Sequence, residues 1–308
     1  MVLDHGFQKR RGWHDKLVGV FRPDELARLI HQVRQSPSGD KNEEPKGEAK
    51  LEFGDDRFDM DLVLTPQGEG QIEVKKLPLA WLTDRPVFFP TRELLTLYPN
   101  FVSVYEGRYL QFEESWRDTC LLLGEPLKKG VQEARIKQLL EPLERAMEGA
   151  LELDKNGRFY LKVNGEKIEI PLVAEGFRKL GMLARLIANG TLLERGYLFW
   201  DEPDANLNPR LVKQVAESIL SLGFSGVQVF LATHSLFLLR ELEILLSSSR
   251  YSHVASTFFG LHRMAGGTRV KQGPSISDIG DIAALDEQLE QSDRFLAEER
   301  KQNDDPLR

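Results

Sequence analysis

The sequence is poor in cysteine and contains no long uncharged hydrophobic run. Its single cysteine, Cys120, cannot form an intramolecular disulfide and has no cysteine partner for a zinc cluster, which indicates a reducing compartment. The most apolar stretch, residues 227–246, is interrupted by His234 and three charged residues, and the N-terminus lacks the apolar core of a secretory signal. We therefore expect a cytoplasmic protein with no membrane-spanning segment.

An excess of positive charge is also missing. The chain has 41 Lys and Arg residues against 48 Asp and Glu residues, a formal net charge of −7, which disfavours a protein that coats nucleic acid. The basic cluster Lys9-Arg10-Arg11 could contact phosphates, but such a cluster is more often a solvated face. Nucleic acid is thus a partner that the net charge does not support. The length of 308 residues allows two domains, or one large domain with an insertion.

The first half of the chain mixes helical, polar and alternating patterns. In order, they predict a short helix after Pro23 within residues 15–35, an exposed linker at 36–47, a β-meander from Lys50 to Lys76, a buried strand at Val87–Pro90, a short helix beginning at 91–95, and a long amphipathic helix or helix pair at 126–153.

The second half predicts strands that alternate with helices. Asn164-Gly165 supplies the positive φ angles of a two-residue hairpin turn between strands at 158–163 and 166–170. The elements predicted after it are a helix at 175–189, a strand at 197–200, a helix at 209–222, a strand at 227–232, a helix at 236–246 and a strand at 255–261. This order predicts a parallel, doubly wound α/β sheet with sites at the carboxyl ends of its strands.

Two carboxylates, Asp201 and Glu202, follow the predicted strand at 197–200 directly. At this position the first carboxylate can orient the hydration shell of Mg²⁺, and the second can polarise a water for attack on a γ-phosphate. The alternative is a pair of solvated loop carboxylates.

A second strand end carries Thr233-His234-Ser235. If the two strands are parallel neighbours, His234 lies near Glu202, where a neutral imidazole can hydrogen-bond a γ-phosphate or an attacking water. A single histidine more often has a structural role. Gly176 stands at a predicted helix start, where phosphates can bind, but it could also be a simple turn residue. Asn208-Pro209 provides a good N-cap and first helical residue, which as local structure requires no function.

Together these segments resemble the C-terminal half of an ATP-binding-cassette ATPase of the OLD/RecF/SMC-like group, whose members are often labelled AAA-type ATP-binding proteins. The resemblance covers about Leu172–Leu261. It implies a P-loop NTPase-like head that uses ATP and Mg²⁺, with Asp201 as the Walker B aspartate that serves the metal, Glu202 as the catalytic base and His234 as the switch histidine. It also assigns contacts with ATP to the signature and D-loop residues Ala174, Glu175, Gly176, Arg178, Asn206 and Asn208.

The segment 88–99, Phe-Phe-Pro-Thr-Arg-Glu-Leu-Leu-Thr-Leu-Tyr-Pro, looks like one found in a prokaryotic branch of these ATPases. Arg92 and Glu93 could link the insertion to the nucleotide site, although an intramolecular ion pair is the simpler explanation.

The sequence departs from the family pattern at two places. Glu175 stands where the signature has a small hydroxyl side chain, and Arg178 and Lys179 could compensate for its charge. No Gly-x-x-x-x-Gly-Lys followed by Ser or Thr occurs in the sequence, so the phosphate-binding loop is missing. Three explanations remain: a shortened product of a longer ATPase, which we prefer because the remaining motifs are intact, a second polypeptide with the missing half, or a degenerate scaffold.

The resemblance implies a head that dimerises around nucleotide and drives a conformational change in a partner, such as a nuclease. Without the phosphate loop, we expect this chain to be inactive alone. The alternative is a non-catalytic pseudo-ATPase module or one half of a split ATPase. The expected parts are an N-terminal lobe remnant at 1–35, a linker at 36–49, a β-rich and helical insertion at 50–153, a C-terminal ATPase lobe at 154–270, and a packing helix with a charged tail at 271–308.

Overall fold

The computed structural model describes residues 12–29, 47–52, 55–65, 71–80, 85–107, 111–193, 196–264 and 267–303. In this part of the chain, no helix combines the length and the apolar character needed to cross a membrane. The predicted linker lies mostly outside the described residues.

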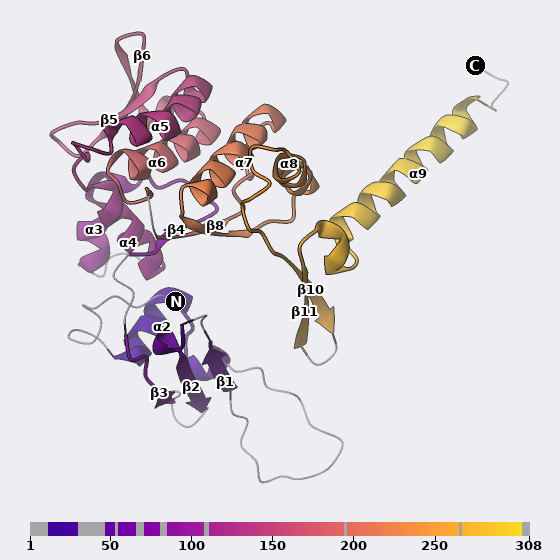
Figure 1. The fold of residues 1–308 in the computed structure, drawn as a ribbon, viewed down its shortest axis with the longest axis horizontal. Helices are drawn as coiled ribbons and strands as arrows, with labels where there is room; N and C mark the ends of the chain where they lie inside the picture. The colour runs from indigo at the N-terminus through magenta and orange to yellow at the C-terminus, as the bar shows by residue number, and fades with distance from the viewer. Residues whose placement is uncertain are drawn as a thin grey trace.

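A parallel sheet of three strands occupies the centre of the molecule (Figure 1), in the order β4-β8-β9. Val87 pairs with Leu198, and Phe89 with Trp200, which in turn pairs with Leu231. The mixed α/β class with a parallel sheet is thereby confirmed. The strands are β4 (Val87–Phe89), β8 (Tyr197–Asp201) and β9 (Gln228–Ala232).

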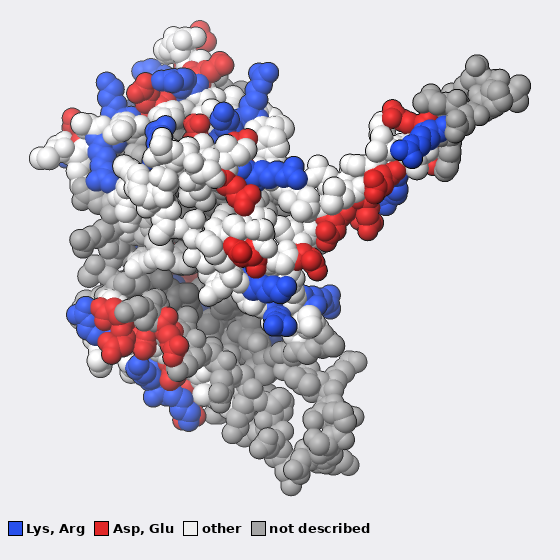
Figure 2. All heavy atoms as spheres, turned by 45° about the vertical axis from the view of Figure 1, so that its right-hand side comes forward, with Lys and Arg blue, Asp and Glu red and all other residues white. Residues whose placement is uncertain are grey.

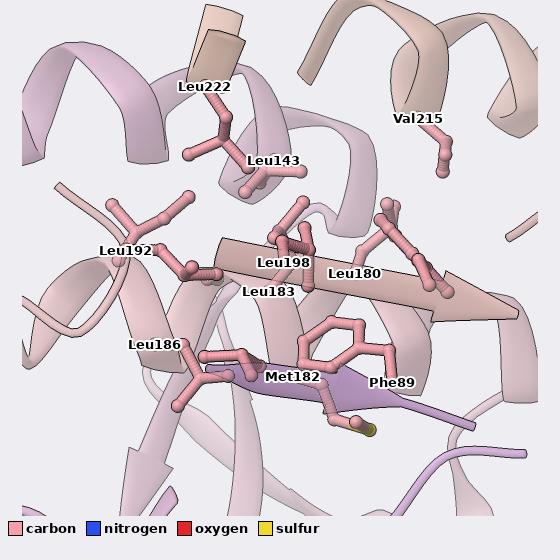
Figure 3. Close-up of a cluster of buried hydrophobic side chains, with 14 of the residues drawn as sticks. Phe89, Leu143, Leu180, Met182, Leu183, Leu186, Leu192, Leu198, Val215 and Leu222 are labelled. Atoms are coloured by element: carbon pink, nitrogen blue, oxygen red, sulfur yellow. The ribbon is translucent and has the colours of Figure 1, made fainter. Parts of the chain in front are cut away.

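Helices close one face of this sheet. Figure 3 shows Phe89 and Leu198 from the sheet surrounded by leucines and Met182 from α6, with Leu143 and Val215 from two further helices nearby. The helices of this layer are α5 (Glu133–Met147), α6 (Glu175–Ala188), α7 (Pro209–Phe224) and α8 (Leu236–Leu246). In α5 and α8 the buried residues lie on one stripe, as Ile136, Leu143 and Met147 do in α5. In α6 every residue from Lys179 to Ile187 is buried, so this helix is covered on all sides.

The second face of the sheet is less covered. Phe88, Phe199 and Phe230 lie in register across the three strands, and the rings of Phe199 and Phe230 stack at 4.7 Å. Phe230 remains 42% exposed, and β9 pairs with β8 alone among the described residues. Parallel sheets are normally covered on both faces, so this side and the free edge of β9 are incompletely packed.

The segment that links β4 to α6 contains helices and a second sheet. The Asn164-Gly165 hairpin is confirmed, with φ angles of 50° and 90° at the turn. The helix expected to begin at 91–95 is wrong: Leu94 and Leu95 are buried in a turn, and the next helix begins at Tyr98. The elements are α3 (Tyr98–Glu106), α4 (Glu114–Leu123), β5 (Ala150–Leu153), β6 (Phe159–Val163), β7 (Glu166–Glu169) and the 3₁₀ helix η3 (Ile170–Leu172).

The predicted helical segment at 126–153 is only partly helical. Helix α5 ends at Met147, because Glu148 adopts the left-handed conformation and closes it. Residues 150–153 instead form β5, which pairs with β6. Pairing with the next strand along the chain therefore overrides helical periodicity here. Moreover, β4 pairs with β8, so the expected insertion at 50–153 contributes a strand to the parallel sheet.

A small N-terminal unit contains the predicted β-meander, whose strands pair in the order β1-β2-β3. The helix predicted after Pro23 is replaced in the described residues by a single 3₁₀ turn, and the α-helix lies before Pro23. This helix contacts the rest of the molecule through a 3.0 Å ion pair between Lys16 and buried Glu114. The elements are α2 (Trp13–Phe21), η1 (Leu26–Leu29), β1 (Gly47–Leu51), η2 (Asp56–Phe58), β2 (Met60–Thr65) and β3 (Gln71–Lys76).

The C-terminal residues form an arm that projects from the body (Figure 1). It consists of a hairpin of β10 (Phe258–Met264) and β11 (Gly267–Gly273), the turn η4 (Ile276–Ile279) and the helix α9 (Ala283–Asn303). The strand predicted at 255–261 thus belongs to an antiparallel hairpin and not to the parallel sheet. The tail helix exists but does not pack as predicted, because Leu289 and Phe295 are 58% and 62% exposed. Figure 2 shows acidic and basic side chains along it.

Candidate functional site

The carboxylate of Asp201 lies at the end of β8 and is held by a neighbouring segment. Thr91, two residues after β4, donates its hydroxyl hydrogen to Asp201 Oδ2 at 2.7 Å. The parallel pairing of β4 and β8 brings these two strand ends together. One carboxylate oxygen is thereby fixed in direction, which is how outer residues orient a metal-binding carboxylate.

Glu202 and His234 meet at the same edge of the sheet, as the sequence predicts. The distance from Glu202 Oε1 to His234 Nδ1 is 2.7 Å, and the backbone N–H of Glu202 donates to Ala232 O at 2.8 Å. The hydrogen bond and the charge of Glu202 raise the pKa of His234 above its usual 6.5, although the imidazole is exposed. The other oxygen, Glu202 Oε2, is buried and has no hydrogen-bond partner among the described residues. Such an orphaned acceptor is suited to a water or another proton donor.

The loop after Glu202 has an unusual backbone. Glu202 and Asn206 adopt φ angles of 47° and 63°, which non-glycine residues seldom do. Thr233 supports the loop by donating its hydroxyl hydrogen to Asp204 Oδ1 at 2.8 Å. Asn208 ends the loop as the predicted N-cap of α7, with its side-chain oxygen accepting from Leu211 N at 3.0 Å. This hydrogen bond gives Asn208 a structural role whether or not it contacts a nucleotide.

The start of α6 packs against this loop. Gly176 is buried, and a Cβ added there would lie 2.8 Å from Leu207 Cδ2 and 3.0 Å from Leu211 Cδ1. The start of α6 is thus packed closely against the side chains of Leu207 and Leu211. Ala174 is the exposed N-cap residue, and its neighbour Glu175 is partly exposed.

The two cations that follow the signature have different surroundings. Arg178 Nε lies 3.2 Å from Glu93 Oε1, so Glu93 forms an intramolecular ion pair that also joins segment 88–99 to the signature helix, while Arg92 is exposed. Lys179 is buried, and Glu175 is one of the charges that act on its ammonium. Arg178 is paired with Glu93, and Glu175 acts electrostatically on Lys179.

The structure brings together Asp201, Glu202 and His234, and it adds two hydroxyl side chains that the sequence analysis did not assign a role. Thr91 and Thr233 both follow strands of the parallel sheet within two residues. Their position after a strand was the signal that could have revealed them. The D-loop and signature residues lie next to this site, but their contacts with ATP remain predictions.

Asp201 is the residue of this site with the chemistry to hold Mg²⁺. The described residues contain no group of three or more His, Cys, Asp or Glu side chains that could hold a metal ion. Asp201 offers an oriented carboxylate, and carboxylate oxygen is a ligand that Mg²⁺ prefers. This fits a metal that binds together with nucleotide phosphates, through one or two carboxylates.

Ligands of open α/β sheets bind at the carboxyl ends of the strands, where Asp201 and Glu202 lie. Comparison with known proteins identifies the family. A family described as "AAA domain, putative AbiEii toxin, Type IV TA system" matches residues 78–240, more than half of the chain. The chain belongs to this family, which is one of P-loop ATPase domains of the AAA type. No curated protein matches the chain.

Several solved structures are similar in part. The Smc head bound to the C-winged helix domain of ScpA is 15% identical, with 83% of this chain and 81% of that chain covered and a TM-score of 0.49. The SMC head domain from Thermotoga maritima is 11% identical over 74% and 73% of the two chains, with a TM-score of 0.36. The Smc head from Pyrococcus furiosus bound to the C-terminal domain of ScpA is 13% identical over 91% and 85%, with a TM-score of 0.41.

Proposed function

We propose that the chain is the catalytic half of an ATPase head of the OLD/RecF/SMC-like group, which binds and hydrolyses ATP with Mg²⁺. The observation that carries the proposal is the 2.7 Å contact between Glu202 and His234 at the ends of adjacent parallel strands. Beside it lies Glu202 Oε2, which is buried and has no hydrogen-bond partner in the described part of the chain. Membership of the AAA family supports the same activity.

Each residue of the site has a separate role in the proposed reaction. Glu202 accepts a hydrogen bond from the attacking water through its free oxygen and acts as the general base. His234 is held by Glu202 and hydrogen-bonds the γ-phosphate. Thr91 keeps the Asp201 carboxylate in a fixed direction toward the metal. Mg²⁺, when bound with ATP, neutralises the charge that develops on the phosphates.

A phosphate-binding loop must come from outside the printed sequence or from another chain, since no Gly-x-x-x-x-Gly-Lys-Ser/Thr occurs within it. Among the described residues β9 pairs with β8 alone, and Phe230 is partly exposed; both observations support a further segment at this side of the sheet. In the complete head, the signature residues Ala174, Glu175 and Gly176 face the nucleotide of a second copy. Closure of this homodimer changes the conformation of a partner protein in the cytoplasm.

Calorimetry with ATP and Mg²⁺, followed by phosphate release, tests the proposal in the wild-type chain, in Glu202→Gln and in a matched control, Glu141→Gln. Glu141 is an exposed carboxylate on α5 that pairs with Arg145. Hydrolysis that falls about 100-fold or more in Glu202→Gln with ATP binding retained, and is unchanged in Glu141→Gln, supports the catalytic base.

Other outcomes favour the alternatives. ATP binding that is equal in all three proteins, without hydrolysis, indicates a non-catalytic module. The absence of binding in all three proteins indicates that the phosphate loop lies outside the printed sequence or on another chain, and the same measurement then applies to the longer protein or to the reconstituted pair.

A further inference from the structure

The ammonium group of Lys179 is buried directly behind the catalytic loop. Lys179 lies in the second turn of α6 and is 2% exposed. Its Nζ atom donates to Ala205 O at 2.6 Å and lies 3.4 Å from Glu202 O. Lysine is almost never fully buried unless its charge has partners. Here the hydrogen-bond partners are backbone carbonyl groups of the loop that begins at Glu202.

This loop needs external support, because part of its backbone is strained. Glu202 and Asn206 have left-handed φ angles, and such residues persist only when their surroundings hold them. Within the loop, Ala205 N donates to Glu202 O at 3.1 Å, and Leu207 N donates to Asp204 O at 3.0 Å. The two carbonyl groups near Lys179 are those of Glu202 and Ala205, the first and last residues of the turn that the Ala205 N to Glu202 O hydrogen bond closes.

The charge of Lys179 also matters to the site. Burial lowers the pKa of Lys179, while the negative charges of Glu175, Asp204, Glu202 and Asp201 act in the opposite direction. Asp201, Glu202 and Asp204 lie within four residues of one another, so their negative charges repel one another. A buried ammonium among them reduces this repulsion.

We propose that Lys179 is a positioning residue, which ties the signature helix α6 to the backbone of residues 202–205 and so holds the Glu202 carboxylate against His234. Its importance for ATP hydrolysis rests on the function proposed above. The tether itself is a property of the chain without nucleotide, and it can be measured there.

The test compares Lys179→Met with Arg178→Met, a matched control that removes the same charge one residue earlier, where the partner is Glu93. The first readout is the pKa of His234, followed by NMR of the histidine ring and assigned with His234→Gln. The second is hydrogen exchange at the amides of Ala205 and Leu207. We expect Lys179→Met to lower the pKa of His234 toward its ordinary value and to speed exchange at both amides. Arg178→Met should change neither.

The direction of the pKa change separates positioning from simple electrostatics. Removal of a positive charge alone raises the pKa of a nearby imidazole, whereas loss of the Glu202 hydrogen bond lowers it. A pKa of His234 that stays constant or rises in Lys179→Met therefore overturns the proposal. Equal exchange rates in Lys179→Met and the wild-type chain also overturn it.

Lys179→Arg provides the rescue, because it keeps the charge and the donors. It should return the pKa of His234 and the exchange rates toward wild-type values, and values equal to those of Lys179→Met would contradict the tether. If Lys179→Met does not fold, Lys179→Gln replaces it, with the same signs expected. If neither the wild-type chain nor a head completed with a phosphate-binding loop hydrolyses ATP although these results hold, the proposed function fails and the inference about the loop stands.

Discussion

The α/β body and the C-terminal arm contain the same kinds of apolar residues in opposite environments. In the body, Leu183 and Leu198 are 0% exposed, and they lie in one cluster with Phe89 (Figure 3). In the arm, Leu289 and Phe295 are 58% and 62% exposed on a helix that extends from the body (Figure 1). The comparison teaches that helical periodicity identifies an apolar face without identifying what covers it.

The largest expected effect is in the body. Leu183→Ala leaves a cavity between α6 and the sheet, and such substitutions destabilise a fully packed core by about 2–5 kcal/mol. Urea unfolding followed by circular dichroism measures the change in free energy of unfolding. A loss below about 1 kcal/mol, outside the range for core leucines, would show that the body is not packed as described.

An intermediate effect is expected at the strand ends, where Thr91 supports Asp201. Thr91→Val removes the hydroxyl donor at nearly constant volume, and loss of a hydrogen bond to a charged group costs about 1.5–3 kcal/mol, with the lower end expected at this partly exposed site. Thr91→Ser keeps the hydroxyl and should retain most of the stability. Equal unfolding midpoints for the Val and Ser variants would contradict a role for this hydrogen bond.

The smallest effect is expected in the arm. Leu289→Ala removes a side chain that is mostly exposed, and alanine is the best helix former, so the free energy of unfolding of the body should change by less than about 0.5 kcal/mol. The same unfolding measurement serves here. A loss as large as that of Leu183→Ala would mean that α9 is covered in solution, and the contrast between body and arm would disappear.

Sequence patterns predicted an element correctly where local signals and tertiary contacts favour the same structure. The boundaries of α8 and the turn at Asn164-Gly165 were predicted correctly, because a capping residue or a turn pair marks them locally. They failed at residues 150–153, where pairing with β6 forms a strand, and at Leu94 and Leu95, which are buried in a turn. At residues 150–153 the deciding contact is pairing with β6, the next strand along the chain, and at Leu94 it is a contact with Met182, 88 residues away.

The candidate site shows the same division. The sequence located Asp201, Glu202 and His234, since each follows an apolar strand and parallel strands end at a common edge. It did not indicate that Thr91 fixes Asp201 or that the ammonium of Lys179 supports the loop, because these contacts span 110 and 26 residues of chain.

The sequence by itself determined the order of strands and helices from residue 158 to residue 246, the carboxylates at the strand ends and Asn208 as the residue that caps α7. These depend on neighbours within a few positions, through backbone conformation, side-chain spacing and capping hydrogen bonds. Only the tertiary structure decided that β4 joins β8, that β10 pairs with β11, and that the apolar side of α9 stays exposed. Strand pairing and burial are settled by competition among distant segments, and local propensity does not encode the outcome of that competition.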